Sequence, residues 1–331
     1  MKNIIITLLF LSYFLITPIT YSEDNNSLDQ FQSNRDQFSV GIYPPILEVK
    51  ANPPAEIESK INLENLSTIS RVFDISVRSI KSSFEGDGTI VYEDEDSINE
   101  PELLIRDKIT IYDDDIPLQE VSLDALEAKE LKLKISLDKD TEIGDYYFSI
   151  LFTASTKGSN TTGSEIPGGI STNLILSIGQ TGEATSGEIK EFKVPSIISS
   201  GPVPITLSIN NKSDHFILPS GRVNIKDMFG RDAGQLNILP QYILANSFRY
   251  MTDTNHILDT QEMSAPHPTI IWPEKFLFGL YTVYAQVKLS ETGPVFETQS
   301  SFIALPFYLL FAVSFVVFVL ISIYLKTKKK I

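Results

Sequence analysis

The stretch "IESKINLEN", residues 57–65, alternates apolar and polar side chains, and this alternation decides the fold class. Ile57, Ile61 and Leu63 fall on one face of an extended chain, and charged or amide side chains occupy the other face. A β-strand places successive side chains on opposite faces of its sheet. The stretch therefore predicts a strand with one buried face and one face in water.

The same period of two recurs along the rest of the chain. It appears at Phe73, Ile75 and Val77, at Leu131, Leu133, Ile135 and Leu137, at Tyr146, Phe148, Ile150 and Phe152, at Val203, Ile205, Leu207 and Ile209, at Val223 and Ile225, and at Val283, Ala285, Val287 and Leu289. Between these runs only "LDALEAKEL", residues 123–131, has a pattern that fits one or two helical turns. Many short strands without intervening helices predict an all-β chain built from β-sandwiches.

The spacing of these runs predicts two tandem sandwiches, at 38–181 and 186–300. The boundary between them is placed near residues 181–187, where Gly, Thr, Ser and Glu replace apolar residues. The polar segment at 156–169 is the competing boundary. We interpret it as a long hairpin loop, because "ISTNLILSIG" after it has the pattern of a return strand for "YYFSILFTA" before it.

The N-terminus has the layout of a secretory signal peptide over residues 1–22. One lysine precedes the apolar stretch "IIITLLFLSYFLITPIT", which ends in small residues before Glu23. An uncleaved N-terminal anchor is the alternative. Both readings send the chain into the export route.

The C-terminal part of the sequence predicts a membrane anchor. Residues Phe302 to Leu325 carry no charge, and a helix of about 20 such residues crosses a bilayer. The lysine-rich tail that follows, residues 326–331, belongs on the cytoplasmic side by the positive-inside rule. We therefore expect a single-pass protein of the cell membrane whose main part lies outside the cell.

The part between the two ends is strongly acidic. Removing Lys2 and the four tail lysines from the 27 basic residues leaves 22 against 42 acidic ones, a net charge of 22 − 42 = −20. Such a charge argues against nucleic acid as a partner. The chain contains no cysteine, so the exported part has no disulfide framework and relies on its hydrophobic cores.

The run "FSVGIYPPILEVKANPPAEIESKINLENLSTISRVFDISVRSI", with the later "IGDYYFSILF", resembles the first domain of bacterial surface proteins with immunoglobulin-like, pilus-chaperone-like sandwiches. "GPVPITLSINNKSDHFILPSGRVNIKDMFG" resembles the second domain of the same proteins. The complete layout is similar to the WxL-interacting proteins. This resemblance implies immunoglobulin-like domains on the cell envelope that bind partner proteins or peptidoglycan.

The most conspicuous reactive residues are Ser213, Asp214 and His215, which are consecutive. Neighbours along an extended chain point to opposite faces, and the strained G-x-S-x-G turn of a serine hydrolase is missing from the sequence. We therefore interpret this segment as a polar turn and predict that the protein is not an enzyme. The other histidines, His256 and His267, lack the spacing of a metal-binding pair.

Two acidic runs are weak candidates for a calcium site. "EDED" contains Glu93 and Asp96, and "DDD" contains Asp113 and Asp115. Calcium takes six to eight oxygen ligands, which two acidic loops at one end of a sandwich would supply. The spacing of a calcium-binding loop is absent, so solvated turn charge is the alternative. No other cofactor is predicted.

Together these observations predict a non-catalytic, membrane-anchored surface protein. It would act as a binding or scaffold protein that recognises an envelope protein or a wall polymer through its sandwich surfaces. The alternative is an envelope-assembly chaperone that acts by strand addition. Trp272, with Ile270, Ile271 and Phe276, is a candidate for an exposed binding patch, and burial in the core is the other reading.

Overall fold

The structure is a computed structural model that describes residues 39–154, 168–179, 186–254, 267–291 and 293–328. The predicted signal peptide, His256, most of the expected 156–169 loop and the tail residues Lys329 and Lys330 lie outside the described residues.

The N-terminal sandwich consists of two sheets. The five-stranded sheet has the order β1-β3-β9-β6-β7, and the six-stranded sheet has the order β2-β11-β10-β4-β5 with β8 also paired to β4. The strand bounds are β1 Val40–Tyr43, β2 Ile46–Ala51, β3 Ala55–Asn65, β4 Arg71–Ser82, β5 Ile90–Tyr92, β6 Ile109–Asp113, β7 Ile116–Leu118, β8 Glu120–Leu123, β9 Ala128–Leu137, β10 Gly144–Ala154 and β11 Gly169–Ile178.

The C-terminal sandwich also consists of two groups of strands. One has the order β12-β14-β17 with β18 also paired to β14, and the other has the order β13-β20-β19-β15-β16. The bounds are β12 Gly187–Lys193, β13 Ile197–Ile198, β14 Val203–Asn211, β15 Ser220–Asp227, β16 Asp232–Ile238, β17 Phe248–Tyr250, β18 Ile270–Trp272, β19 Gly279–Lys288 and β20 Val295–Ala304.

Each sandwich encloses its own core, built from the alternating residues. Strand β3 shows the pattern directly, since Ile61 and Leu63 are fully buried while their neighbours Lys60 and Glu64 are exposed. The prediction of a mostly β chain built from sandwiches is confirmed at this level. The return strand is also confirmed, because β11 pairs antiparallel with β10 over its full length.

The opening segment of the N-terminal sandwich passes from one sheet to the other. β1 pairs antiparallel with β3 of the five-stranded sheet, and β2 pairs parallel with β11 of the six-stranded sheet. Pro44 and Pro45 lie at the crossing, where proline limits further pairing. As a result, β2 is the terminal strand of the six-stranded sheet, and it has a strand neighbour on one side in the sheet order.

Two local expectations differ from the structure. Residues 124–127 of "LDALEAKEL" form a turn in which Leu126 has a φ of 60°, and β9 begins at Ala128, so the expected helical turns are wrong. A short helix, α3 at Glu100–Arg106, lies elsewhere. Its first turn is capped by the Asn99 side chain, which accepts a hydrogen bond from the backbone nitrogen of Glu102. A 3-10 turn, η1 at Glu95–Ser97, precedes it.

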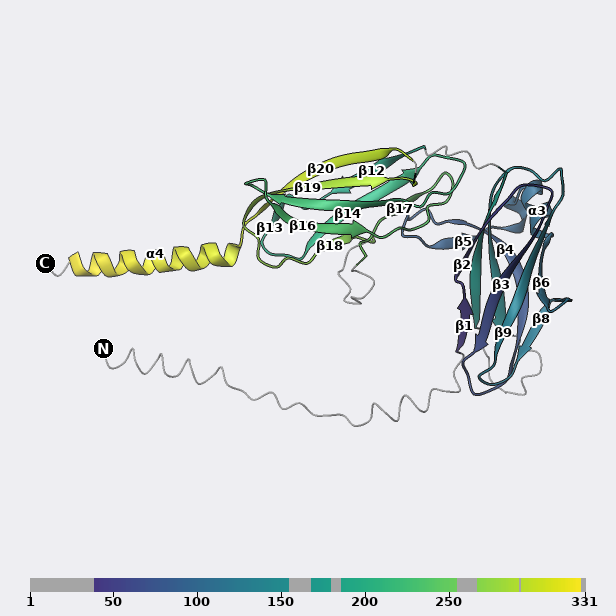
Figure 1. Cartoon of the computed structure of the whole chain (residues 1–331). Helices are drawn as coiled ribbons and strands as arrows, with labels where there is room; N and C mark the ends of the chain where they lie inside the picture. Colours follow the sequence, from purple (N-terminus) through teal and green to yellow (C-terminus); the bar gives the residue numbers. More distant parts are fainter. Residues whose placement is uncertain (1–38, 155–167, 180–185, 255–266, 292, 329–331) are drawn as a thin grey trace.

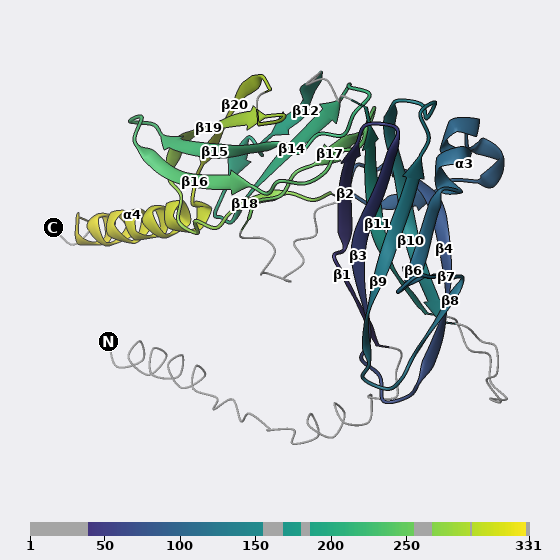
Figure 2. The same cartoon turned by 45° about the vertical axis from the view of Figure 1, so that its right-hand side comes forward.

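The two sandwiches meet at an angle, so that one end of the C-terminal sandwich lies against the side of the N-terminal sandwich (Figure 1). The view turned by 45° shows the same arrangement, with α3 on the part of the N-terminal sandwich away from the contact (Figure 2). The N-terminal sandwich presents the outer face of its six-stranded sheet to this contact, as the residue contacts below show.

The C-terminal helix α4 spans Phe307–Lys328. In the part of the chain that the structure describes, no helix is both long and apolar enough to cross a membrane. The predicted span from Phe302 to Leu325 is therefore not supported by the described residues, and its first residues, Phe302 and Ala304, belong to β20 and are buried in the core. The end of β20, which faces the core, and the start of α4 are both apolar and uncharged, so the sequence pattern does not separate them. The predicted end of the second sandwich, residue 300, likewise falls inside β20.

Candidate binding site between the sandwiches

The outer face of the six-stranded sheet is covered by the C-terminal sandwich. Ile80 on β4 and Ile175 on β11 are each only 5% exposed, yet neither belongs to the core cluster of the N-terminal sandwich. Both residues instead line a pocket together with residues 240–244 of the C-terminal sandwich. The junction is therefore an apolar contact that was not apparent from strand alternation alone.

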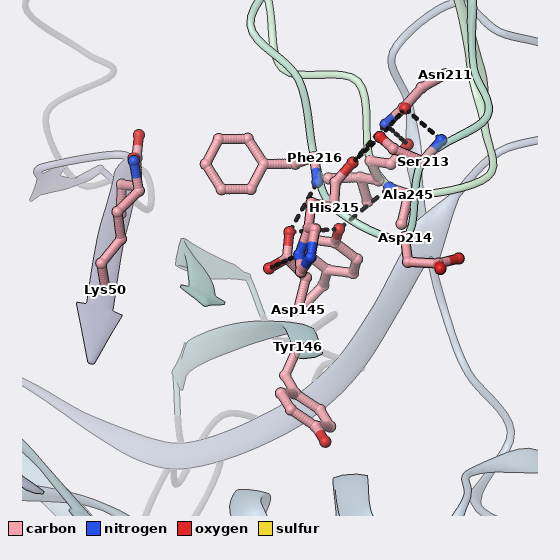
Figure 3. Close-up of polar contacts among 12 residues, drawn as sticks. Lys50, Asp145, Tyr146, Asn211, Ser213, Asp214, His215, Phe216 and Ala245 are labelled. Carbon is pink, nitrogen blue, oxygen red and sulfur yellow. Dashed lines mark hydrogen bonds and ion pairs between the residues drawn. The ribbon is translucent and has the colours of Figure 1, made fainter. Parts of the chain in front are cut away.

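A buried carboxylate is the polar centre of the junction. Asp145, at the start of β10, has no exposed side-chain surface. One of its oxygens lies 3.0 Å from Nδ1 of His215, and the other accepts hydrogen bonds from the backbone nitrogen of Phe216 at 2.7 Å and from the Tyr147 hydroxyl at 3.3 Å. Figure 3 shows Asp145 directed at the 215–216 segment, with Tyr146 pointing away. The two partners in the C-terminal sandwich, His215 and Phe216, fix the position of one sandwich on the other, and Tyr147 holds the carboxylate in place from its own strand.

Further contacts extend the junction on both sides of Asp145. The backbone nitrogen of Ala245 donates to the Tyr147 hydroxyl at 3.1 Å, and the Tyr242 hydroxyl donates to Glu48 at 3.0 Å. The backbone nitrogen of Tyr250 donates to the carbonyl of Gly86 at 2.7 Å. The β4–β5 loop thus lies directly on β17.

Beside these contacts lies a pocket of about 370 Å³. Its floor crosses the six-stranded sheet from the edge strand β2 to β5 and is formed mainly by isoleucines, and its roof is the segment 240–244 with Arg249. The floor residues are Ile46, Ile80, Ser82, Gly88, Ile90, Tyr147, Asn173 and Ile175. A mostly apolar, concave site with a few polar groups is typical of a ligand-binding pocket.

Three polar atoms in the wall of this pocket are buried and have no hydrogen-bond partner among the described residues. They are Oδ1 of Asn173, Oε1 of Gln241 and Nε of Arg249. Buried polar atoms normally have partners, because an unpaired one costs about 1–3 kcal/mol. Two acceptors and one donor around an isoleucine floor fit a ligand that offers both N–H and C=O groups beside apolar side chains.

Burial also changes the ionisation of two groups at the site. Burial lowers the pKa of the Arg249 guanidinium, which the nearby Asp87 carboxylate partly offsets. Burial raises the pKa of the Tyr147 hydroxyl, and the charge of Asp145 adds to this effect. The Tyr147 hydroxyl therefore remains a neutral hydrogen-bond donor at physiological pH.

The Ser213–Asp214–His215 segment forms a structural corner. The Ser213 hydroxyl shares its one proton between Oδ1 of Asn211 at 2.5 Å and the His215 carbonyl at 2.9 Å, while the His215 ring is turned to Asp145. The Asp214 carboxylate points away from both (Figure 3) and accepts a long hydrogen bond from Asn246. The three side chains have three separate sets of partners, in agreement with the polar-turn interpretation.

The amide of Asn211 closes this corner, and Asn65 does the same in the N-terminal sandwich. Nδ2 of Asn211 donates to the carbonyls of His215, Ile243 and Leu244. Nδ2 of Asn65 donates in the same way to the carbonyls of Ile69, Leu123 and Asp124, and Oδ1 of each asparagine accepts from a serine two residues later. The N-x-S sequences at these two sites are therefore buried structural motifs.

The acidic calcium candidates lie on different sheets. Asp113 ends β6 of the five-stranded sheet and accepts from Lys129 at 3.0 Å, whereas Glu93 follows β5 of the six-stranded sheet and lies 4.0 Å from Lys81. Asp96 and Asp115 are exposed in turns. Within the described residues no three His, Asp or Glu side chains are placed to share a metal ion. Calcium binding by these residues remains a hypothesis.

The residues of the candidate patch around Trp272 lie partly in the core and partly on the surface. Trp272 and Ile270 are buried, and Trp272 packs edge-on against Tyr281 and Phe302. For these two residues the interpretation as core is confirmed and the exposed patch is excluded, because both side chains face inward from β18. Phe276, by contrast, is exposed. His267 stacks on Tyr250.

The residues that make the junction were not identified from the sequence. Asp145, Tyr147 and Arg249 lie far apart along the chain, and each occurs in an ordinary strand pattern. One signal was present. The stretch "YYFSILF" has tyrosine or an aliphatic residue on both faces of β10 at Tyr147 and Leu151, which is typical of a strand covered on both sides.

The sequence matches no protein-family model and no curated protein. Among solved structures, it is similar to the class 5 fimbriae chaperone CfaA, with 13% identity over 81% of this chain and 100% of that chain and a TM-score of 0.37. The E. coli chaperone DraB gives 12% identity over 81% and 98%, with a TM-score of 0.36. The YadV chaperone gives 11% identity over 79% and 98%, with a TM-score of 0.33. At these values no partner or activity is transferred to this chain.

Proposed function

We propose that this protein is a non-catalytic binding protein of the cell envelope that holds an extended segment of a protein partner in the pocket between its sandwiches. The observation that carries the proposal is the set of unpaired atoms on Asn173, Gln241 and Arg249 around an isoleucine floor. A polypeptide offers backbone N–H and C=O groups together with apolar side chains, so it pairs with all parts of this wall. A wall glycan offers mainly hydroxyl groups and would leave the apolar isoleucine side chains without matching apolar contacts.

Attachment to the cell membrane through the uncharged segment that ends at Leu325 is part of the proposal. It rests on the sequence, namely the run without charge and the lysines that follow it. The pocket would then be displayed outside the cell at the far end of the C-terminal sandwich from the anchor.

Strand addition is a second candidate function, and the position of β2 favours it. β2 is the terminal strand of the six-stranded sheet, and Ile46 at its start lines the pocket. A partner segment paired with the outer edge of β2 would direct alternate side chains toward the pocket floor. This is the mode in which a chaperone-like protein would hold an extended client.

The two modes are tested with peptide ligands. The full-length protein, held in detergent, is used to select binders from a library of unstructured nonapeptides. Calorimetry should show one peptide bound per chain. Ile90→Arg, which places a charge on the pocket floor, should weaken binding at least tenfold. Ile116→Arg is the matched control, because Ile116 is exposed on β7 of the other sheet. Equal affinity in both variants would rule out the pocket.

Hydrogen exchange then separates the two functions. Strand addition predicts that binding slows exchange of the β2 amides that face away from β11. Pocket binding without strand addition predicts that these amides exchange as in the free protein. If the library yields no ligand and soluble peptidoglycan fragments bind instead, the partner is a wall polymer and the proposal is wrong.

A further inference from the structure

The end of the C-terminal sandwich nearest α4 carries a group of exposed apolar side chains, which we call the collar. Its members are between 44% and 70% exposed. They are Ile197, Met228, Phe229, Phe276, Phe278, Leu280 and Ile303. A contiguous group of apolar side chains on a solvent-exposed surface indicates an interaction surface.

The register of the strands shows that the collar is continuous. Ile197 on β13 lies opposite Ile303 on β20, and Ile303 lies opposite Leu280 on β19. Asp227 pairs with Tyr281, so Met228 follows at the level of Leu280. These side chains form one row across the outer face of the sheet.

Three phenylalanines lie just beyond this row. Phe276 and Phe278 come from the loop before β19, and Phe229 comes from the β15–β16 turn. They extend the row past the end of the strands, toward the side from which α4 leaves.

The collar lies next to the start of α4. Only Leu305 and Pro306 separate β20 from the helix, and Leu305 is held by a hydrogen bond to the carbonyl of Ile198. The hydroxyl of Tyr308 in the first turn lies 3.2 Å from that of Ser200. The helix therefore leaves the sandwich directly from the collar end, as Figure 1 shows.

The distances leave little room between the collar and a bilayer. Two extended residues reach about 7 Å. The headgroup layer on each side of the hydrocarbon core is about 5–8 Å thick. Under the proposed attachment, in which the uncharged segment ending at Leu325 lies in the lipid, the collar lies at the level of the headgroups, where apolar side chains are buried at the boundary with the acyl chains.

We infer that the collar is a lipid-binding surface that seats the C-terminal sandwich on the outer leaflet. This inference rests on the proposed membrane attachment and adds a second contact to it. Charged groups at the collar include both signs, since Arg231 and Lys275 lie beside Asp227, Asp232 and Glu274. The surface therefore fits a zwitterionic lipid such as phosphatidylcholine, and apolar burial supplies the attraction.

The lack of cysteine in the chain permits a direct test. Phe278→Cys and, separately, Met228→Cys are labelled with an environment-sensitive fluorophore in the full chain. Phe84→Cys is the control, because Phe84 is 89% exposed in the β4–β5 loop of the N-terminal sandwich. Each protein is reconstituted into phosphatidylcholine vesicles that contain a headgroup-linked nitroxide quencher.

We expect all three labelled proteins to float with the vesicles. The nitroxide should lower the fluorescence at least threefold for labels at positions 278 and 228 and should change it little for the label at position 84. Flotation with equal quenching at all three sites would overturn the inference while leaving membrane attachment intact. Failure to float would overturn both. The fluorophore at position 278 could also report an apolar environment in the absence of lipid, with a signal that increases with protein concentration. That result would show that a second copy of the protein covers the collar, and it would also refute the inference.

Discussion

At the residue scale, the two buried asparagines, Asn65 and Asn211, hold chain corners together, a role that the strand pattern of the sequence does not predict. Asn65 and Asn211 each direct their two amide N–H groups at a cluster of three backbone carbonyls, at the point where a strand leaves its sheet. A corner of this kind turns the chain without leaving buried carbonyls unpaired. That the same motif recurs in both sandwiches indicates a shared structural requirement.

Replacing Asn211 by alanine should lower the free energy of unfolding by about 1–3 kcal/mol, because the backbone nitrogen of Ser213 loses its acceptor and the carbonyls of His215, Ile243 and Leu244 lose one of their donors. The matched control is Asn237→Ala on the exposed face of β16, with an expected change within about 0.5 kcal/mol. Urea unfolding followed by far-ultraviolet circular dichroism measures the difference. Equal midpoints for the two variants would contradict the role of the corner.

At the element scale, the β4–β5 loop connects the sandwiches through its glycines. A Cβ atom on Gly86 would collide with the ring of Phe248 on β17, and one on Gly88 would collide with the guanidinium of Arg249. Both glycines have a positive φ, which other residues adopt at a cost. The polar "EGDG" turn of the sequence is therefore closely packed against β17 of the C-terminal sandwich.

Gly86→Ala should destabilise the protein more than Gly230→Ala. The φ values are 70° and 76°, so both changes carry a similar backbone cost of about 1–2 kcal/mol. A Cβ on Gly230 meets nothing within 4 Å, whereas one on Gly86 displaces Phe248. We expect an additional loss of about 1–2 kcal/mol for Gly86→Ala in thermal or urea unfolding. A smaller loss than for Gly230→Ala would refute the contact.

The sequence predicted the elements better than their contacts. Alternation identified strands such as β3 and β14 because one face of each is buried in its own sandwich. It missed α3, which has only seven residues, although Asn99 and Pro101 are typical start signals. It also missed the pairing of His215 with Asp145, since residues 70 positions apart meet only through tertiary packing.

At the scale of the whole molecule, the junction determines how the sandwiches are oriented. Its polar centre is Asp145, and its apolar part is the pocket floor with Ile80 and Ile175. An interface with few anchors can be opened without unfolding either core. Changes at these anchors should therefore alter the shape of the molecule before they alter its secondary structure.

Asp145→Ala should loosen the junction, because Phe216 loses the acceptor for its backbone nitrogen and His215 loses its partner. Small-angle scattering of the chain in detergent should show a larger radius of gyration with unchanged circular dichroism. Asp138→Ala is the control, because Asp138 is exposed and its carboxylate pairs with Lys108 of the same sandwich at 2.6 Å. An unchanged radius for Asp145→Ala would show that the apolar contact suffices.

High pH should open the same junction. The pKa of Tyr147 is raised above its ordinary value of 10 by burial, so the folded form holds the proton more tightly than the opened form does. The resulting stabilisation is present below pH 10 and is lost as the pH rises further, by up to about 1.4 kcal/mol per unit. Tyr147→Phe should remove this part of the pH dependence. Identical scattering profiles of the two proteins against pH would contradict the assignment.

The two-residue connection at Leu305 and Pro306 has a mechanical consequence. The junction and α4 lie at opposite ends of the C-terminal sandwich, so a load on a bound partner would run lengthwise along β20 (Figure 1). β20 pairs with β19 over ten residues, from Val295 to Ala304. Tension in that direction shears all of these pairs together instead of peeling them one by one. If the proposed anchor and partner hold the two ends, this arrangement resists mechanical unfolding of the C-terminal sandwich.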